Sequence, residues 1–322
     1  MQVNSEGALT KLNPELYMAS NSWQCRHNLM ALERFQKSFK RDAKGEEQYL
    51  DLGCGTGDFT REDMLPHCLP CGRIVAVDVS KDMVEHARGH FAHPKIVYDV
   101  LNAVEDDVSC FVGRYGQFDH VFSLFCLNRV KHQAKAFKNI ALLMKPGGSC
   151  LLLFVASTPL TGFRQELALR TRWAKYAQVC HDLVPPTHDL KGDDALELYM
   201  KDLLMAANLT PSVCEVVHVR FDFPDLESLT RSYLAWNPMM TLVMEEERPL
   251  FLEDIKVQAR KLWSIKEGAP VKAGVSRVAS PRTPSSAGGT CTLGARCLVS
   301  SVATDPSHVG HHTRTQGAGH LL

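Results

Sequence analysis

The stretch Gln48-Tyr49-Leu50-Asp51-Leu52-Gly53-Cys54-Gly55-Thr56-Gly57-Asp58 decides the fold of this chain. A short apolar run, Tyr49 to Leu52, ends in three glycines at alternate positions. This is typical of a buried strand that enters a loop passing close to a ligand. A dinucleotide-binding loop needs the spacing G-x-G-x-x-G, whereas here G-x-G-x-G is followed by Asp58. We therefore expect the first strand and the ligand loop of an α/β domain.

The same residues, Asp-Leu-Gly-Cys-Gly-Thr-Gly, are similar to the cofactor motif of S-adenosylmethionine-dependent methyltransferases. The chemistry suits that ligand, because a methionine ammonium needs a nearby carboxylate and a nucleoside has to lie against bare backbone. A plain strand-to-helix turn would also use glycine, but it explains neither three glycines nor the placed acid. The resemblance implies a cofactor site that includes Asp51, Gly53, Cys54, Gly55 and Gly57.

Strand and helix patterns alternate five times around this motif. Apolar runs predict strands at 49–52, 73–78, 95–100, 118–125 and 149–156, with helices at 81–90 and 133–144 among the connections. This alternation predicts a doubly wound, Rossmann-like parallel sheet. Within a domain at 13–263 we expect a helical lid at 13–40, a cofactor-binding core at 46–156, and substrate-side helices with an edge strand at 157–263.

The two ends of the chain and its composition set limits on function. Residues 1–12 are predicted to be flexible, and 264–322, rich in Ser, Gly, Pro, Thr and His, to be a disordered tail. The net charge of zero gives no electrostatic case for nucleic acid. With no export signal and no apolar run near ~18 residues, we expect a cytoplasmic protein without a membrane span. The sequence leaves the oligomeric state open.

Eleven cysteines are scattered over the predicted elements, and we expect them to be reduced thiols. The segment Cys68-Leu69-Pro70-Cys71, with His67 beside it, is the one spacing that could indicate a zinc or redox site. It lacks a second pair of ligands, so we predict a surface turn there and no metal site.

Further cofactor contacts are expected at the ends of the following strands. Asp78 closes the second strand 21 positions after Gly57, where a carboxylate can accept both hydroxyls of a ribose. Val79 follows it directly. Asn102, after the third strand, can offer a side-chain oxygen to the amine of an adenine. Ser123, in the fourth strand, completes the expected cofactor set.

Several segments together resemble the juvenile hormone acid methyltransferases of arthropods over about residues 13–240. They are Asn13-Pro14-Glu15-Leu16-Tyr17, Asn21-Ser22 with Gln24, the glycine loop, Phe118-Asp119-His120-Val121-Phe122-Ser123, Ala136-Phe137-Lys138-Asn139-Ile140 and Leu151-Leu152-Leu153-Phe154. The resemblance implies a class I methyltransferase that esterifies the carboxylate of a farnesoic-type acid. In that family a glutamine of the N-terminal helix and a tryptophan after the fourth strand lie at this carboxylate. Gln24 matches the glutamine.

The chain departs from the family pattern at three places. It has Leu127-Asn128-Arg129 where the family has Leu-His-Trp, and Leu101-Asn102 where the family has Leu-Asp. The closing antiparallel strand of the family is missing or reduced to 256–260. We expect Arg129, if it points inward, to pair with the substrate carboxylate; the alternative is an exposed arginine at a loop edge.

The substrate predicted from these residues is a small-molecule carboxylic acid. A carboxyl group has a reference pKa of about 4.3, so its anion needs no general base at neutral pH. Gln24 would orient the carboxylate, while Trp173 and Trp236 would help to wall a pocket for an isoprenoid or fatty chain unless they belong to the core. Alternatives are a methyltransferase for a phenol or an amine, and a noncatalytic relative that binds cofactor or lipid. A nicotinamide dehydrogenase is disfavoured by Asp58.

Overall fold

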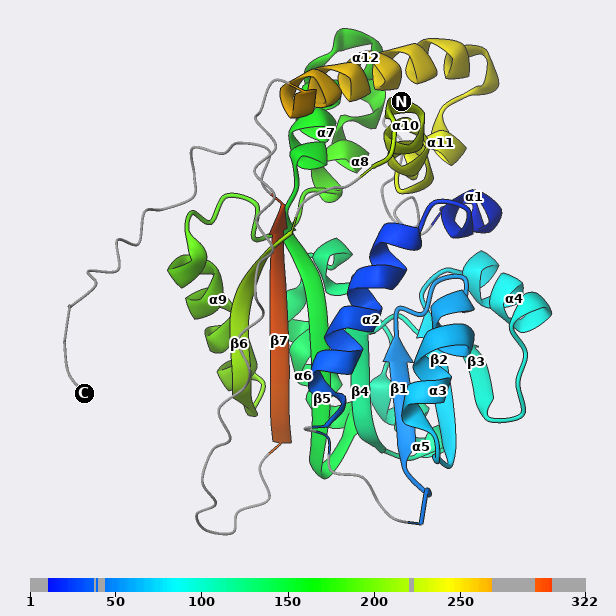
Figure 1. Ribbon diagram of the computed structural model, residues 1–322, viewed down its shortest axis with the longest axis vertical. Helices are drawn as coiled ribbons and strands as arrows, with labels where there is room; N and C mark the ends of the chain where they lie inside the picture. Colours follow the sequence, from blue (N-terminus) through cyan, green and yellow to red (C-terminus); the bar gives the residue numbers. More distant parts are fainter. Residues whose placement is uncertain (1–10, 38, 40–43, 220–222, 268–292, 303–322) are drawn as a thin grey trace, which may run out of the picture.

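The computed structural model describes residues 11–37, 39, 44–219, 223–267 and 293–302. In this part of the chain seven strands form one parallel sheet in the order β3-β2-β1-β4-β5-β7-β6 (Figure 1). The doubly wound, Rossmann-like prediction is confirmed. The strands are β1 Gln48–Leu52, β2 Arg73–Asp78, β3 Ile96–Val100, β4 Phe118–Leu124, β5 Met144–Ser157, β6 Leu209–Val219 and β7 Leu293–Val302.

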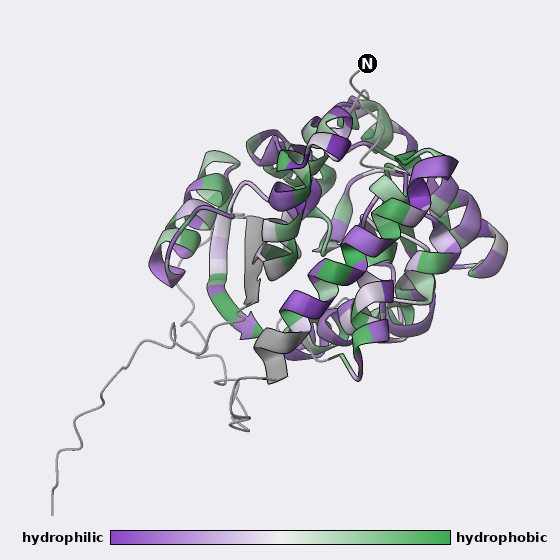
Figure 2. Cartoon of the chain, turned by 90° about the horizontal axis from the view of Figure 1, so that it is seen from above, coloured by the Kyte–Doolittle hydropathy of each residue, from purple (hydrophilic) through white to green (hydrophobic). Residues whose placement is uncertain are grey.

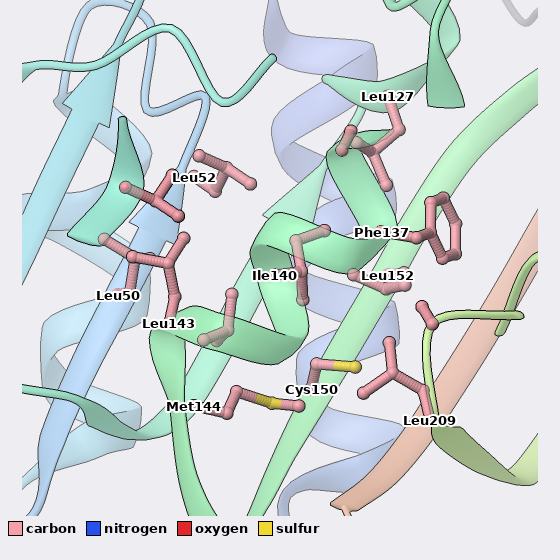
Figure 3. Packing of buried hydrophobic residues seen from close by; sticks show 14 of the residues in the cluster. Leu50, Leu52, Leu127, Phe137, Ile140, Leu143, Met144, Cys150, Leu152 and Leu209 are labelled. Carbon is pink, nitrogen blue, oxygen red and sulfur yellow. The ribbon is translucent and has the colours of Figure 1, made fainter. Parts of the chain in front are cut away.

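Helices cover both faces of the sheet because the central strands are apolar on both sides. One face packs against α5 Val108–Tyr115, α6 Gln133–Leu143 and α9 Asp193–Ala206. In this cluster Leu50 of β1, Ile140 of α6 and Leu152 of β5 are fully buried (Figure 3). The other face packs against α2 Ser22–Gln36, η1 Thr60–Met64, α3 Leu65–Cys68 and α4 Lys81–His90. Hydrophobic and hydrophilic residues alternate around the helices, as expected when one side of each faces a core (Figure 2).

A separate group of helices, which we call the cap, lies beyond the carboxyl ends of the strands (Figure 1). It has its own apolar core, in which Trp173, Tyr176, Tyr233 and Phe251 are the largest fully buried side chains. The cap consists of α7 Pro159–Leu169, η3 Thr171–Tyr176, α8 Ala177–Asp182, α10 Leu226–Ala235, α11 Met239–Leu242, η4 Glu245–Glu247 and α12 Arg248–Glu267. Open parallel sheets bind their ligands at this end, so the cap and the strand ends bound the site.

The segment predicted to be a helical lid contains α1 Pro14–Met18 and α2, and we call these two helices the lid. The Asn13 side chain caps α1 by accepting a hydrogen bond from the Leu16 backbone N–H at 2.8 Å. The lid packs on the apolar face of the sheet through Trp23, Leu32 and Phe35, which are all buried. Residues 1–10, expected to be flexible, lie outside the described residues.

Two expectations for the C-terminal part were wrong. The segment 256–260 lies inside α12, so it is not a reduced antiparallel strand. Leu293–Val302, within the tail predicted to be disordered, forms β7 between β5 and β6 and runs parallel to both. This strand was not evident from the sequence, because Gly294, Arg296, Ser300 and Ser301 interrupt the continuous apolar run that is typical of a central parallel strand. Residues 268–292 and 303–322 of the tail lie outside the described part of the chain.

The Cys68–Cys71 segment also differs from the prediction. Leu69 is 42% exposed, but both cysteines are buried in the second apolar cluster beside Met64 and Leu65. These thiols therefore pack as small apolar groups, and the turn is not simply a surface feature. Over the described residues, no three His, Cys, Asp or Glu side chains gather as metal ligands. None of the helices in that part of the chain combines the length and apolar character that a membrane span requires.

Candidate active site

The glycine loop turns sharply at the end of β1 and packs tightly on what lies behind it. Gly53 and Gly57 have φ values of 90° and 80°, which side chains rarely adopt. A Cβ at Gly53 would collide with Cys126, and one at Gly57 would come within 2.7 Å of the Ala87 Cβ. Both positions therefore require glycine.

Three carboxylates surround this loop. Asp78, at the end of β2, accepts hydrogen bonds from the backbone N–H groups of Gly55 (3.0 Å) and Ser80 (2.9 Å). Asp51 is buried in β1 and accepts one from the Thr60 hydroxyl at 2.6 Å. Burial raises the pKa of Asp51 to about 6 and also raises the pKa of Asp78. A ligand cation placed here would offset that cost of burial.

The third carboxylate, Asp58, joins the loop to the lid. It accepts hydrogen bonds from the Thr56 hydroxyl at 2.6 Å and from the Asn21 side-chain amide at 2.8 Å. The Tyr17 ring lies over the loop, since a Cβ at Gly55 would be 3.6 Å from its Cε1. The lid is therefore fixed directly on the glycine loop.

A cavity lies between the lid, the loop and the end of β4. The Oε1 atom of Gln24 is buried in this region, without a hydrogen-bond donor among the residues that the structure describes. The Oε1 atom of Gln24 is therefore available to accept a hydrogen bond from a ligand. The lining residues are Tyr17, Asn21, Gln24, Cys25, Asn28, Asp51, Gly53, Cys54, Gly55, Asp58, Phe59, Leu124 and Phe125.

Arg129 points inward, which excludes the alternative of an exposed arginine at a loop edge. It ends the short helix η2 Leu127–Arg129, and its Nη2 donates a hydrogen bond to the Trp236 carbonyl oxygen at 3.0 Å. Its Nη1 is buried and has no acceptor in the described part of the chain. Burial lowers the pKa of Arg129, while the nearby Tyr17 and Asp78 raise it. The guanidinium therefore lies near the cofactor loop with a hydrogen-bond donor to spare.

Two expected cofactor contacts have other partners in the structure. The Ser123 hydroxyl is fully buried and donates to the Leu52 carbonyl oxygen at 3.0 Å, so it links β4 to β1. The Asn102 side-chain oxygen accepts from the backbone N–H groups of Val104 (3.0 Å) and Glu105 (3.1 Å). Asn102 therefore stabilises its own turn, and its amide N–H₂ is the better candidate for contact with an adenine.

The remaining predicted residues divide between the site and the cap. Val79 is 43% exposed at the end of β2, beside Asp78. Trp236 follows α10 and meets Arg129 through its carbonyl oxygen. Trp173 is buried in the cap core, where its indole N–H donates to Asp254 at 2.7 Å. Trp173 is thus a core residue of the cap. Its indole N–H is buried with it and therefore needs the acceptor that Asp254 provides.

Sequence reasoning missed Tyr17 and Asp58 as parts of the site. Tyr17 stood in the N-terminal motif and Asp58 directly after the glycines, so both were visible as neighbours of predicted site residues.

The comparisons with known proteins agree with this geometry. A family model described as a methyltransferase domain matches residues 50–150. Juvenile hormone acid O-methyltransferase of Bombyx mori is 31% identical over 228 residues, which cover 70% of this chain and 79% of that protein. The chain belongs to the juvenile hormone acid methyltransferase family. The Drosophila melanogaster member is 30% identical over 179 residues, or 54% of this chain and 58% of that protein.

This methyltransferase uses S-adenosyl-L-methionine as its cofactor. The residues around the loop fit that molecule, because the buried carboxylates of Asp51 and Asp78 could offset the charge of a cationic ligand and the glycines present backbone without side chains to a nucleoside. Among solved structures, a methyltransferase from Anabaena variabilis aligns with a TM-score of 0.41 at 19% identity, over 62% of this chain and 82% of that one. The fold assignment rests on the strand order described above.

Proposed function

We propose that this methyltransferase esterifies the carboxylate of a small apolar acid of isoprenoid, farnesoic or fatty type. The observation that carries the proposal is the inward guanidinium of Arg129, whose Nη1 is buried without an acceptor in the described structure. A buried cation of this kind is costly unless an anion pairs with it. The names of the two relatives, both juvenile hormone acid O-methyltransferases, support an acid as that anion.

The cofactor, when bound, supplies an electrophilic methyl group, and the remaining tasks fall on residues of this chain. Asp78 would hold the ribose hydroxyls and Asp51 would lie near the methionine ammonium. Arg129 pairs with the substrate carboxylate and Gln24 orients it by a hydrogen bond. The lid, fixed by Asn21, keeps water from the reacting groups. Catalysis is then mainly a matter of holding a carboxylate oxygen in line with the methyl group.

A phenol or an amine suits this cavity less well. Such a nucleophile, with a reference pKa near 10, needs a base at neutral pH. No histidine or lysine lines the described cavity, and its two carboxylates, Asp51 and Asp58, are assigned here to the cofactor ammonium and to the lid. Burial raises the pKa values of both Tyr17 and Cys25, so neither side chain can easily give up its proton to act as a base. An acid, which is already an anion, avoids this requirement.

The test is methyl transfer to a panel of acids, phenols and amines by the wild type and by Arg129→Gln. We expect methyl esters from acids, and a loss of about 10–100-fold in kcat/KM in the variant, mainly through KM, because a charged hydrogen bond is lost. Arg231→Gln is the matched control, since Arg231 is an exposed arginine that pairs with Glu227. Equal activity of the Arg129 variant, or methylation of phenols or amines alone, would contradict the proposal.

A further inference from the structure

Helix α2 changes character along the side that faces the sheet and the glycine loop. The side chains that it contributes to the cavity follow at three- and four-residue steps and so share one side of the helix. They are Asn21, Gln24, Cys25 and Asn28. One turn further, the same side carries Leu32 and then Phe35, which are buried against the sheet. The polar residues therefore belong to the part of α2 that passes the cavity.

Asn28 is the member of this group that the packing of the protein explains least. It is 8% exposed, and its Oδ1 atom is buried without a hydrogen-bond donor in the described part of the chain. A buried acceptor without a donor is costly, because it has lost its bonds to water. Asn21, on the same side of α2, instead bonds to Asp58 at 2.8 Å. A donor from a ligand would satisfy Asn28.

The cavity that Asn28 lines is small and rich in acceptors. Its volume of about 30 Å³ admits a group of the size of one or two water molecules, whereas pockets that enclose a whole small molecule measure roughly 300–1,000 Å³. Two carboxylates, of Asp51 and Asp58, line it, and no lysine, arginine or histidine is among its described lining residues. These charges repel a small anion and attract a small cation. The cavity therefore suits one compact cationic donor.

The two carboxylates differ in the donors that they already have. Asp58 uses both oxygens, since the Thr56 hydroxyl donates to Oδ1 at 2.6 Å and the Asn21 amide to Oδ2 at 2.8 Å. Asp51 accepts from the Thr60 hydroxyl at 2.6 Å through Oδ2. An ionised carboxylate can accept about four hydrogen bonds. Asp51 thus has capacity for a cation beside Asn28.

We propose that Asn28 is a cofactor-binding residue, whose Oδ1 accepts a hydrogen bond from the α-ammonium of S-adenosylmethionine. An ammonium has three N–H donors. The cavity offers it three acceptors, namely the Asp51 carboxylate, the Oδ1 of Asn28 and the Oε1 of Gln24. Gln24 keeps its N–H₂ group for the substrate carboxylate. The inference rests on the proposed function for the place of Asp51, but it does not depend on which nucleophile takes the methyl group.

The experiment measures binding to the full chain by calorimetry at pH 8 with two probes. They are S-adenosylhomocysteine and its deamino analogue, in which a hydrogen atom replaces the ammonium. We expect the wild type to bind S-adenosylhomocysteine about tenfold or more tightly than the analogue. Asn28→Leu, similar in size but unable to accept a hydrogen bond, should weaken S-adenosylhomocysteine by about threefold to tenfold and leave the analogue unchanged. Asn28→Asp keeps an acceptor and should retain the preference.

The control makes the same substitution on the opposite face of the sheet. Asn139 lies on α6 and donates to the Ala103 carbonyl oxygen at 2.7 Å. Asn139→Leu should bind both probes as the wild type does. Urea unfolding of the variants shows that each is folded under the conditions of the titration.

Three results would overturn the inference. Equal binding of the two probes by the wild type would mean that the cavity does not hold the cofactor ammonium, and this comparison needs no variant to fold. An equal loss for both probes in Asn28→Leu would leave Asn28 with a structural role in the lid. A loss of the preference in Asn28→Asp would mean that Asn28 faces an anionic group through its N–H₂.

The proposed function fails separately from this inference. A preference for S-adenosylhomocysteine that Asn28→Leu removes, without a methyl ester from any acid, would contradict esterification and leave Asn28 in the cofactor site. Ester formation from acids, with both probes unaffected by Asn28→Leu, would do the reverse.

Discussion

The glycine loop and the cap face each other across the site with opposite charges. On the loop side lie Asp51, Asp58 and Asp78, and on the other side lies the guanidinium group of Arg129, which is joined to the cap by its hydrogen bond to the Trp236 carbonyl oxygen. A cationic cofactor and an anionic acid would be sorted to the two sides by this arrangement alone. We therefore expect each reactant to bind at the side of the site that carries the opposite charge, and each side can be tested independently.

The largest effect, on cofactor affinity, is expected beside the glycine loop, at Asp78. Asp78→Ala removes the acceptor for the ribose hydroxyls and also the support for the Gly55 N–H, so cofactor affinity should fall by about 100-fold or more. Calorimetric titration with S-adenosylmethionine measures it. Asp82→Ala, at an exposed position on α4, is the control and should bind normally. Unchanged binding in Asp78→Ala would remove this carboxylate from the cofactor site.

The next effect tests whether the loop must be bare backbone. Gly57→Ala places a Cβ near Ala87 at a positive φ, and should lower the free energy of unfolding by about 1–3 kcal/mol and weaken cofactor binding. Gly89→Ala, in α4 with open space around it, should instead stabilise the chain by roughly 0.5–1 kcal/mol. Urea unfolding compares the two. Equal free energies of unfolding for the two variants would show that the loop accommodates a Cβ at position 57 without strain.

A smaller effect, on pH dependence, separates Asp51 from the other carboxylates. Its pKa of about 6 in the folded chain lies above that of an unfolded Asp, so the folded state binds the proton more tightly. Lowering the pH from 7 to 5 should therefore raise the contribution of Asp51 to stability. Over the same range the affinity for the cationic cofactor should fall by about tenfold, because protonation removes the charge.

Asp51→Asn is the matched variant for this pH series. It should abolish the tenfold change in affinity and the rise in stability together. A wild type whose cofactor affinity is flat between pH 5 and pH 7 would mean that Asp51 does not face the ammonium.

The smallest effect, on kcat/KM, is expected from the lid. Asn21→Ala removes a hydrogen bond to Asp58 and should lower kcat/KM by about threefold to tenfold, because the lid then holds less firmly. Asn139→Ala removes a hydrogen bond of similar length, 2.7 Å to the Ala103 carbonyl oxygen, on the far face of the sheet. It should reduce stability only. Equal kinetic losses in the two variants would show that the lid bond has no special role.

The sequence predicted the residues around the glycine loop better than it predicted the contacts between Arg129 and the cap, for physical reasons. Strand β2 was expected at 73–78 and occurs there, because a strand buried on both faces is one continuous apolar run. The glycines were informative because their φ values exclude most other residues. Ser123, in contrast, was assigned to the cofactor, since strand position alone does not reveal that its hydroxyl bonds across to β1.

The contacts between Arg129 and the cap join distant parts of the chain. Arg129 meets Trp236, 107 positions further along, and no local pattern determines whether such an arginine points in or out. Arg164 of α7 is enclosed by α8 and α10. The spacing of residues along α7 does not show which other helices will pack against it. β7 escaped prediction because glycine, arginine and serine residues interrupt its apolar run.

The position of β7 also has a consequence for synthesis of the protein. Since β7 separates β5 from β6, the strand Leu209–Val219 has no other hydrogen-bonded strand beside it within the described residues, and it gains this neighbour only when Leu293–Val302 has left the ribosome. A ribosome adds roughly 5–20 residues per second, so β5 and β6 present unpaired edges for some seconds in every nascent chain. During that interval we expect the incomplete chain to depend on chaperones more than the completed protein does.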